Sequence, residues 1–207
     1  MRNPLLVVSC CLAAACATPE KAGEPGGAVQ MLEKGGGTVD PYLKVIEQFS
    51  EGDADYESFY NQFAYRATLV NAPVREATLL READYFKWDP SQLAAEREKA
   101  AQKMEQSTEV FMSFFTPERR NDNLVDGKSI WRVYLDVGGK RYQGRPKRAK
   151  KLFAELNALF PYHTRWNTPY VIEFALPTAA IEGQISKLTV TGPLGTKDVR
   201  FESTVSP

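Results

Sequence analysis

The densest cluster of chemically capable side chains in this sequence is basic. Seven lysines and arginines fall within twelve residues that contain no acid: Lys140, Arg141, Arg145, Lys147, Arg148, Lys150 and Lys151. Such a run can bind anionic lipid, the phosphates of lipopolysaccharide or nucleic acid; the alternative is that it is only the solvated surface of a hairpin end and a helix start. Because the whole chain balances 26 basic against 26 acidic residues, no global field favours nucleic acid. We therefore expect anionic lipid or lipopolysaccharide as the partner of this run, and no nucleic acid.

Two other groups could support catalysis. His163 is the one histidine of the chain, and the intrinsic pKa of a histidine suits a general base. No carboxylate stands beside it in the sequence, so we favour a surface or loop-packing role. Pairs of carboxylates occur at Asp53/Asp55 and Asp122/Asp126, as a glycosidase would need on either side of a cleft. Turns are rich in aspartate for other reasons, so a hydrolase built on these groups is the alternative and not the first expectation.

The sequence lacks several common catalytic patterns. Gly127-Lys128-Ser129 resembles the end of a phosphate-binding loop, but Asp122 stands where that loop requires a glycine. No Gly-x-Ser-x-Gly elbow is present. A single histidine, with all three cysteines in the first 16 residues, does not supply a common zinc site. We expect no catalytic residue, no metal and no cofactor.

The first 16 residues have the composition of a secretory signal peptide. Arg2 supplies positive charge, residues 5–15 are apolar, and three alanines precede Cys16. The eleven apolar residues fall short of the ~20 that a membrane-spanning helix needs. Ala13-Ala14-Ala15-Cys16 resembles the lipobox of bacterial lipoproteins. The resemblance implies that residues 1–15 are removed and that Cys16 carries the lipid; an ordinary leader ending nearby is the alternative.

The same resemblance implies a location and an anchor. A lipoprotein of this kind is held in the bacterial cell envelope by its acylated cysteine, so the membrane itself is a partner. Ala17, in place of an aspartate after the cysteine, implies the outer membrane. The following residues to position 39 hold six glycines and two prolines and predict a flexible tether, so residues 16–39 form the lipidated cysteine and its tether.

Residues 40–207 are expected to form a single globular domain that starts with helices and one strand. Asp40-Pro41 is typical of a helix start, and Gly52 is placed to end that helix. Residues 59–69 alternate as in a strand, and residues 74–88 favour a helix. Asp89 begins a capping box, and apolar residues including Phe111 and Phe115 then recur at helical spacing, which predicts one long helix over 89–116.

The second half of the chain is expected to be mostly strands. Residues 131–137 and 140–144 alternate on either side of Gly138-Gly139, which is typical of a hairpin turn. Residues 146–160 predict a helix, and strands are expected over 170–176, 185–190 and 199–201. The order predicts an α+β fold: a small antiparallel β-sandwich with an immunoglobulin-like strand pattern and helical insertions. The core Cys–Trp–Cys signature of immunoglobulin domains is missing.

These observations favour a binding protein. Residues 131–135 and 170–177 resemble stretches of uncharacterised bacterial envelope lipoproteins, and the diffuse resemblance covers about residues 59–202 without implying a catalytic residue. We therefore expect a non-catalytic cell-envelope lipoprotein that binds a ligand or assists assembly with another envelope protein. The alternative is an envelope hydrolase that uses carboxylates or His163.

Overall fold

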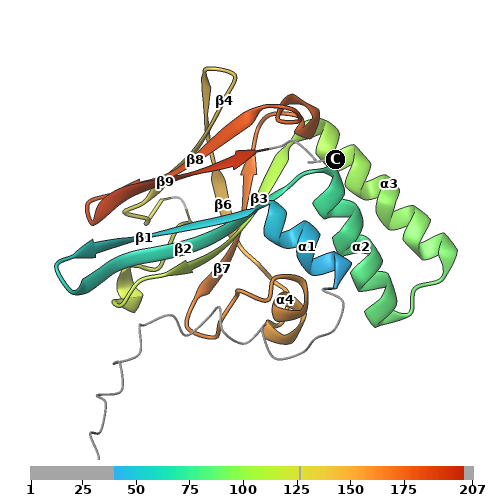
Figure 1. Ribbon diagram of the computed structural model, residues 1–207, viewed down its shortest axis with the longest axis horizontal. Helices are drawn as coiled ribbons and strands as arrows, with labels where there is room; N and C mark the ends of the chain where they lie inside the picture. The colour runs from blue at the N-terminus through green and yellow to red at the C-terminus, as the bar shows by residue number, and fades with distance from the viewer. Residues whose placement is uncertain (1–39, 126, 203–207) are drawn as a thin grey trace, which may run out of the picture. The chain divides into compact units, whose positions relative to one another are not determined.

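The computed structural model describes residues 40–125 and 127–202, which form two antiparallel sheets and four α-helices (Figure 1). The five-stranded sheet has the order β1-β2-β3-β7-β6, and the four-stranded sheet has the order β5-β4-β8-β9. This arrangement confirms the α+β class and the sandwich-like pairing of two antiparallel sheets. The residues predicted to form a signal peptide, a lipidated Cys16 and a tether lie outside the described residues, as does Asp126.

The strands are β1 (Ser50–Glu57), β2 (Tyr60–Val70), β3 (Thr108–Phe115), β4 (Arg132–Val137), β5 (Lys140–Gln143), β6 (Arg145–Arg148), β7 (Thr168–Phe174), β8 (Ile185–Gly192) and β9 (Gly195–Glu202). The helices are α1 (Pro41–Gln48), α2 (Ala72–Phe86), α3 (Pro90–Gln106) and α4 (Phe153–Leu159), with short 3-10 turns η2 (Arg119–Asn121) and η3 (Thr178–Ala180).

One hydrophobic core lies between the two sheets. Phe63, Trp131 and Phe114 meet there, with ring centroids 4.7 Å apart for Phe63 and Trp131 and 5.4 Å apart for Phe114 and Trp131. Residues that alternate along β2, β4 and β8 point their apolar side chains into this core. The apolar residues of the alternating sequence pattern are therefore the ones that face the core from each strand.

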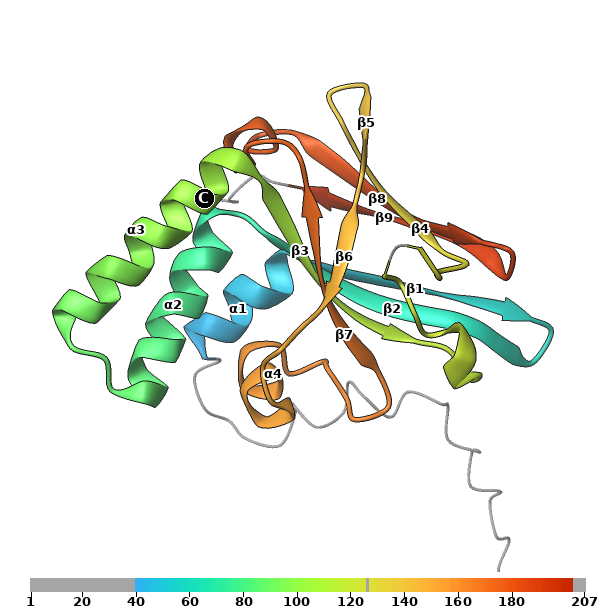
Figure 2. The same ribbon diagram turned by 180° about the vertical axis from the view of Figure 1, so that it is seen from behind.

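A second core lies on the opposite face of the five-stranded sheet. Figures 1 and 2 show α1, α2 and α4 on that face. Phe111 of β3 stacks on Phe160 with ring centroids 3.9 Å apart, and Tyr42, Val74 and Leu156 join the same cluster. The central strands of this sheet are consequently covered on both faces.

The long helix expected over residues 89–116 is wrong beyond Gln106. The chain leaves α3 there, and Thr108–Phe115 forms β3 between β2 and β7. A strand covered on both faces has apolar residues at successive positions, so its sequence does not show period two. Phe111 is still a core residue, but it reaches the core from a strand.

The helix expected over residues 146–160 is also only partly right. Arg145–Arg148 forms β6, at the edge of the five-stranded sheet where Pro146 is tolerated, and α4 begins at Phe153. Between β5 and β6 the chain passes from one sheet to the other at Gly144. A Cβ there would lie 2.6 Å from Ile172 Cγ2, so the close packing at this crossing requires glycine. The sequence reading also missed the acidic edge strand β1, whose residues lack apolar alternation.

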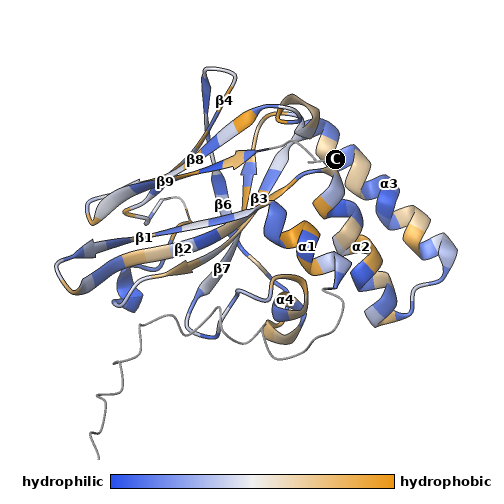
Figure 3. Ribbon diagram, in the orientation of Figure 1, coloured by the Kyte–Doolittle hydropathy of each residue, from blue (hydrophilic) through white to orange (hydrophobic). Residues whose placement is uncertain are grey.

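Helix α3 begins with a side-chain cap. Its described residues include none that is fully buried, and Figure 3 shows hydrophilic residues along its length. Asp89 accepts hydrogen bonds from the backbone of Ser91 and Gln92, and the Gln92 side chain accepts one from the Asp89 backbone. The predicted capping box is confirmed.

We expect Asp89→Ala to destabilise α3 by about 1 kcal/mol, because the first backbone N–H groups lose their acceptor. Hydrogen exchange of the α3 amides should become faster, while the strands should keep their protection. Asp84→Ala is the control, since it removes only an exposed ion pair with Lys87. Unchanged exchange in α3 would show that the cap does not limit the stability of this helix.

Candidate functional site

The structure divides the basic run among three elements. Lys140 and Arg141 lie on β5, three members lie on β6, and Lys150 and Lys151 lie between β6 and α4. The half of the run that was expected on a helix is therefore on an edge strand and a loop. Because β5 and β6 belong to different sheets, the run is not the hairpin end and helix start that the sequence predicts.

Four members of the run have acidic partners from other parts of the chain. Arg141 pairs with Asp136 at 2.7 Å and Arg148 with Asp122 at 3.2 Å, while Lys147 pairs with Glu173 and Lys151 with Glu82. In the described part of the chain, Lys140, Arg145 and Lys150 form no ion pair. Much of the charge is neutralised locally; binding of the run to an anionic surface stays a prediction.

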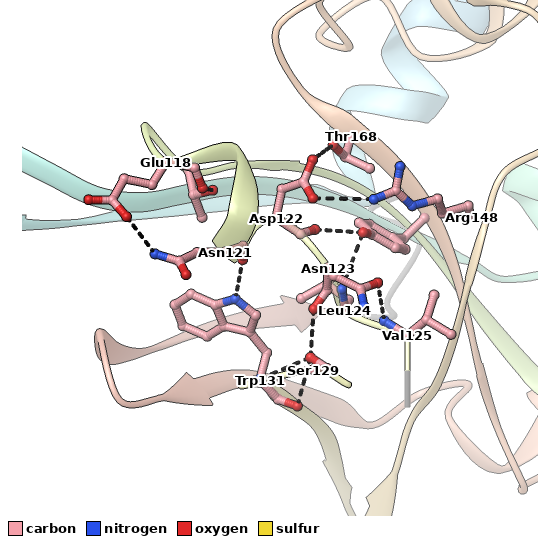
Figure 4. A network of polar contacts seen from close by, with 12 residues as sticks. Glu118, Asn121, Asp122, Asn123, Leu124, Val125, Ser129, Trp131, Arg148 and Thr168 are labelled. Carbon is pink, nitrogen blue, oxygen red and sulfur yellow. Dashed lines mark hydrogen bonds and ion pairs between the residues drawn. The ribbon is translucent and has the colours of Figure 1, made fainter. Parts of the chain in front are cut away.

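The aspartates that suggested chemistry have structural contacts. The Asp122 carboxylate accepts a hydrogen bond from Thr168 Oγ1 and pairs with Arg148, as Figure 4 shows. Its backbone carbonyl accepts from Tyr170 Oη, so this loop is tied to β7. Asp53 and Asp55 lie on β1, where Asp55 pairs with Lys197 of β9 at 3.3 Å. The contacts of Asp122 and Asp55 therefore tie a loop to β6 and β7, and β1 to β9.

His163 lies inside the protein. It is 3% exposed, and its Nδ1 lies 2.9 Å from Ser113 Oγ on β3. The rings of Phe111 and Phe153 pack against the imidazole, and its contacts among the described residues include no carboxylate. Burial lowers the pKa of His163 below its ordinary value, because the charged imidazolium would lose hydration without gaining a counter-ion.

This burial predicts a stability that depends on pH. The unfolded chain binds a proton at His163 near its ordinary pKa of about 6.5, whereas the folded chain binds it only at lower pH. The free energy of unfolding should therefore be greatest above about pH 6.5 and fall as the pH drops below it, by up to about 1.4 kcal/mol per pH unit.

Denaturation by urea between pH 7.5 and 5.5 measures this effect. Because His163 is the one histidine, the loss of stability over that interval should be smaller in His163→Gln than in the wild type. The same slope in both proteins would contradict an imidazole that is neutral in the folded state.

A pocket between α2, α4 and the five-stranded sheet gathers charged groups over an apolar floor. Its cavity volume is about 230 Å³. Six apolar side chains form the floor: Val70, Phe111, Leu156, Leu159, Phe160 and Val171. Five charged side chains surround it: Arg75, Glu82, Glu109, Lys150 and Lys151. We call this the charged-rim pocket.

The local sequence positions each part of this pocket. Asn71 caps α2 by accepting from the Val74 backbone at 3.1 Å, so α2 begins directly after β2 and presents Arg75, Thr78 and Glu82 on one face. The strands β2, β3 and β7 supply the floor residues that point away from the sandwich core. The segment between β6 and α4 brings Lys150 and Lys151 to the opposite side.

Ion pairs hold the rim together. Arg75 pairs with Glu109, and Lys103 of α3 pairs with the same carboxylate at 2.6 Å. Lys151 pairs with Glu82 across 69 positions of sequence. Arg75 Nε is buried and has no hydrogen-bond partner among the described residues, and Lys150 has no ion pair there. The pocket rim therefore includes one cation, Lys150, without an acidic partner among the described residues.

A larger hollow of about 550 Å³ lies between α2, α3 and η3. Ala100, Ala101 and Met104 line it, and the Arg97–Glu76 pair borders it. It is wide open to solvent. Ligand sites are concave and apolar with a few convergent polar groups, a description that the charged-rim pocket fits better.

Sequence reasoning found two of the rim residues, Lys150 and Lys151, and missed Arg75, Glu82 and Glu109. No sequence pattern connects those three with the basic run, because 34 positions separate Arg75 from Glu109 and 69 separate Lys151 from Glu82. None of the other described candidates lines either hollow; they include His163, Asp53, Asp55 and Asp122 and the remaining five residues of the basic run, while Asp126 lies outside the described residues.

The fold and this pocket define an α+β sandwich domain with an apolar cavity rimmed by charge. No known protein family matches the chain, and no curated protein matches it. Of the helices in residues 40–125 and 127–202, none is both long enough and apolar enough to cross a membrane.

Proposed function

We propose that this protein is a non-catalytic cell-envelope lipoprotein whose domain is a binding module, with its ligand held in the charged-rim pocket. The observation that carries the proposal is the pocket itself. An apolar floor from three strands and α4 lies beneath charged side chains that converge from α2, β3 and the segment before α4. Sites that bind small molecules combine these two features.

The groups on which a hydrolase could be built have other contacts. His163 faces Ser113 and aromatic rings in the interior, and Asp122 is engaged by Thr168 and Arg148. Asp55 is paired with Lys197. A general acid or base has to reach substrate, and none of these side chains lines either of the two hollows described above. This favours binding over hydrolysis.

A neutral apolar probe tests the pocket. N-phenylnaphthylamine should bind the full chain carrying Cys16→Ser, a variant chosen so that the measurement needs no detergent, and its fluorescence should rise. Ala149→Phe should weaken this binding at least about tenfold, because a phenyl ring would fill space beside the floor. Ala95→Phe is the matched control on the exposed surface of α3. Equal binding by both variants, or none by the parent, would refute a ligand-binding pocket here.

The anchor has its own test. The resemblance of residues 13–16 to a lipobox supports acylation of Cys16, which lies outside the described residues. We expect Cys16→Ser to move the protein from the membrane fraction to the soluble fraction, since several acyl chains anchor firmly and none remains in the variant. Fatty-acid labelling of the wild type should be lost in the variant. A variant that stays in the membrane, with no label in the wild type, would contradict the proposed anchor.

A further inference from the structure

We infer that the charged-rim pocket binds a small amphiphile with one acidic head group and an apolar body. The inference rests on the proposed function and adds the chemical class of the ligand. Three properties of the pocket support it: its unpaired cation, the guanidinium that lines it and its size.

The charge inside the pocket is unbalanced by one. Arg75, Lys150 and Lys151 face two carboxylates, Glu82 and Glu109. Arg75 pairs with Glu109 and Lys151 with Glu82, so Lys150 is the cation without an acidic partner among the described residues. A third acidic group would balance the three cations, whereas a cationic head group would add to the excess. The pocket therefore favours a monoanion.

The guanidinium of Arg75 points to the same ligand chemistry. Arg75 lines the pocket, its side chain is 26% exposed, and one of its terminal nitrogens, Nη2, donates to Glu109. Hydrogen bonds from a guanidinium to a carboxylate or phosphate oxygen are among the strong ones. An oxyanion near Arg75 and Lys150 would interact with both cations.

The apolar floor and the volume of the pocket limit the polarity and the size of the rest of the ligand. Phe111, Phe160 and Val171 offer carbon surface and no hydrogen-bonding side-chain group, so the body of the ligand should be apolar. The volume of about 230 Å³ lies below the ~300–1,000 Å³ of sites for drug-sized molecules. A short acyl or single-ring acid fits these limits better than a whole phospholipid.

The experiment compares octanoate with 1-octanol as competitors of N-phenylnaphthylamine, again on the full chain carrying Cys16→Ser. The two competitors share a chain length and differ in charge. Octanoate should displace the probe with an inhibition constant about tenfold lower than that of 1-octanol, as one charge-assisted interaction provides. Added salt should reduce this preference, because the rim is partly exposed.

Two lysine variants test whether Lys150 causes the preference for octanoate over 1-octanol. Lys150→Gln should bring the two inhibition constants within about twofold of each other, because the unpaired cation is lost. Lys140→Gln is the matched control: it removes an unpaired cation of the same basic run that lies on β5 and does not line the pocket. The preference should persist there. Loss in both variants would attribute it to the general charge of the run and overturn the assignment.

The remaining outcomes separate this inference from the proposed function. If the probe binds and 1-octanol competes as well as octanoate, the acidic head group is wrong while the binding pocket stands. If the probe binds and neither competitor displaces it, the ligand class is wrong. If the probe itself does not bind, the proposed function fails with it.

Discussion

Trp131→Ala is expected to lower the free energy of unfolding by about 3–5 kcal/mol. Trp131 is 1% exposed, and its ring lies against Phe63 and Phe114 in the core between the sheets. Its Nε1 donates to the backbone carbonyl of Asn121 at 2.7 Å, as Figure 4 shows. The variant would lose burial of a large ring, leave a cavity and remove the donor from a partly buried carbonyl.

Urea denaturation followed by far-ultraviolet circular dichroism measures this loss. Trp166→Ala is the matched control, because that ring is 73% exposed and its truncation should change stability by no more than about 0.5 kcal/mol. Trp131→Phe should fall between the two, since it keeps ring contacts but loses the hydrogen bond. Similar small losses for Trp131→Ala and Trp166→Ala would show that the sheets do not pack through Trp131.

Phe111→Ala is expected to cost a similar amount, about 3–5 kcal/mol, in the other core. Phe111 is 2% exposed and stacks on Phe160, and its ring also contacts Tyr162 and His163. Truncation would open a cavity under α4 and enlarge the floor of the charged-rim pocket. Packing of the helices on the sheet and the shape of the pocket therefore depend on the same side chain.

Two exposed positions serve as controls for Phe111. Phe59 is 96% exposed at the β1–β2 turn, and Lys99 lies on the solvent side of α3. Replacement of either by alanine should change stability by at most about 0.5 kcal/mol. Because both cores share the five-stranded sheet, Phe111→Ala and Trp131→Ala should each shift one common transition. Two separate transitions in the Phe111 variant would show that the helical layer unfolds by itself.

Local features of the fold could be predicted because their causes are local. The caps at Asp40 and Asp89 form where the sequence indicates them, because each satisfies backbone donors two or three residues away. Gly138 and Gly139 both take positive φ and turn β4 into β5, as their residue type permits. Strands with one face more buried than the other, such as β4 and β7, also showed their alternation.

The two segments that were wrongly predicted to be helical are those whose burial or pairing depends on distant parts of the chain. Residues 108–115 resemble a helix face in sequence, and they form a strand because β2, β7, α1 and α4 enclose it. Residues 145–148 follow no apolar pattern, and they form β6 because β7 pairs with them at the sheet edge. Neither partner can be identified from neighbouring residues.

The sequence by itself determined the α+β class, the caps, the hairpin turns and the presence of a basic run. These features could be predicted because the backbone hydrogen bonds and the side-chain periodicity behind them involve residues only a few positions apart. Only the tertiary structure decided that four of the seven basic residues meet acids and that His163 is buried against Ser113. It also decided the pocket, because Arg75, Glu109 and Lys150 come together only when α2, β3 and the segment before α4 pack around one apolar floor.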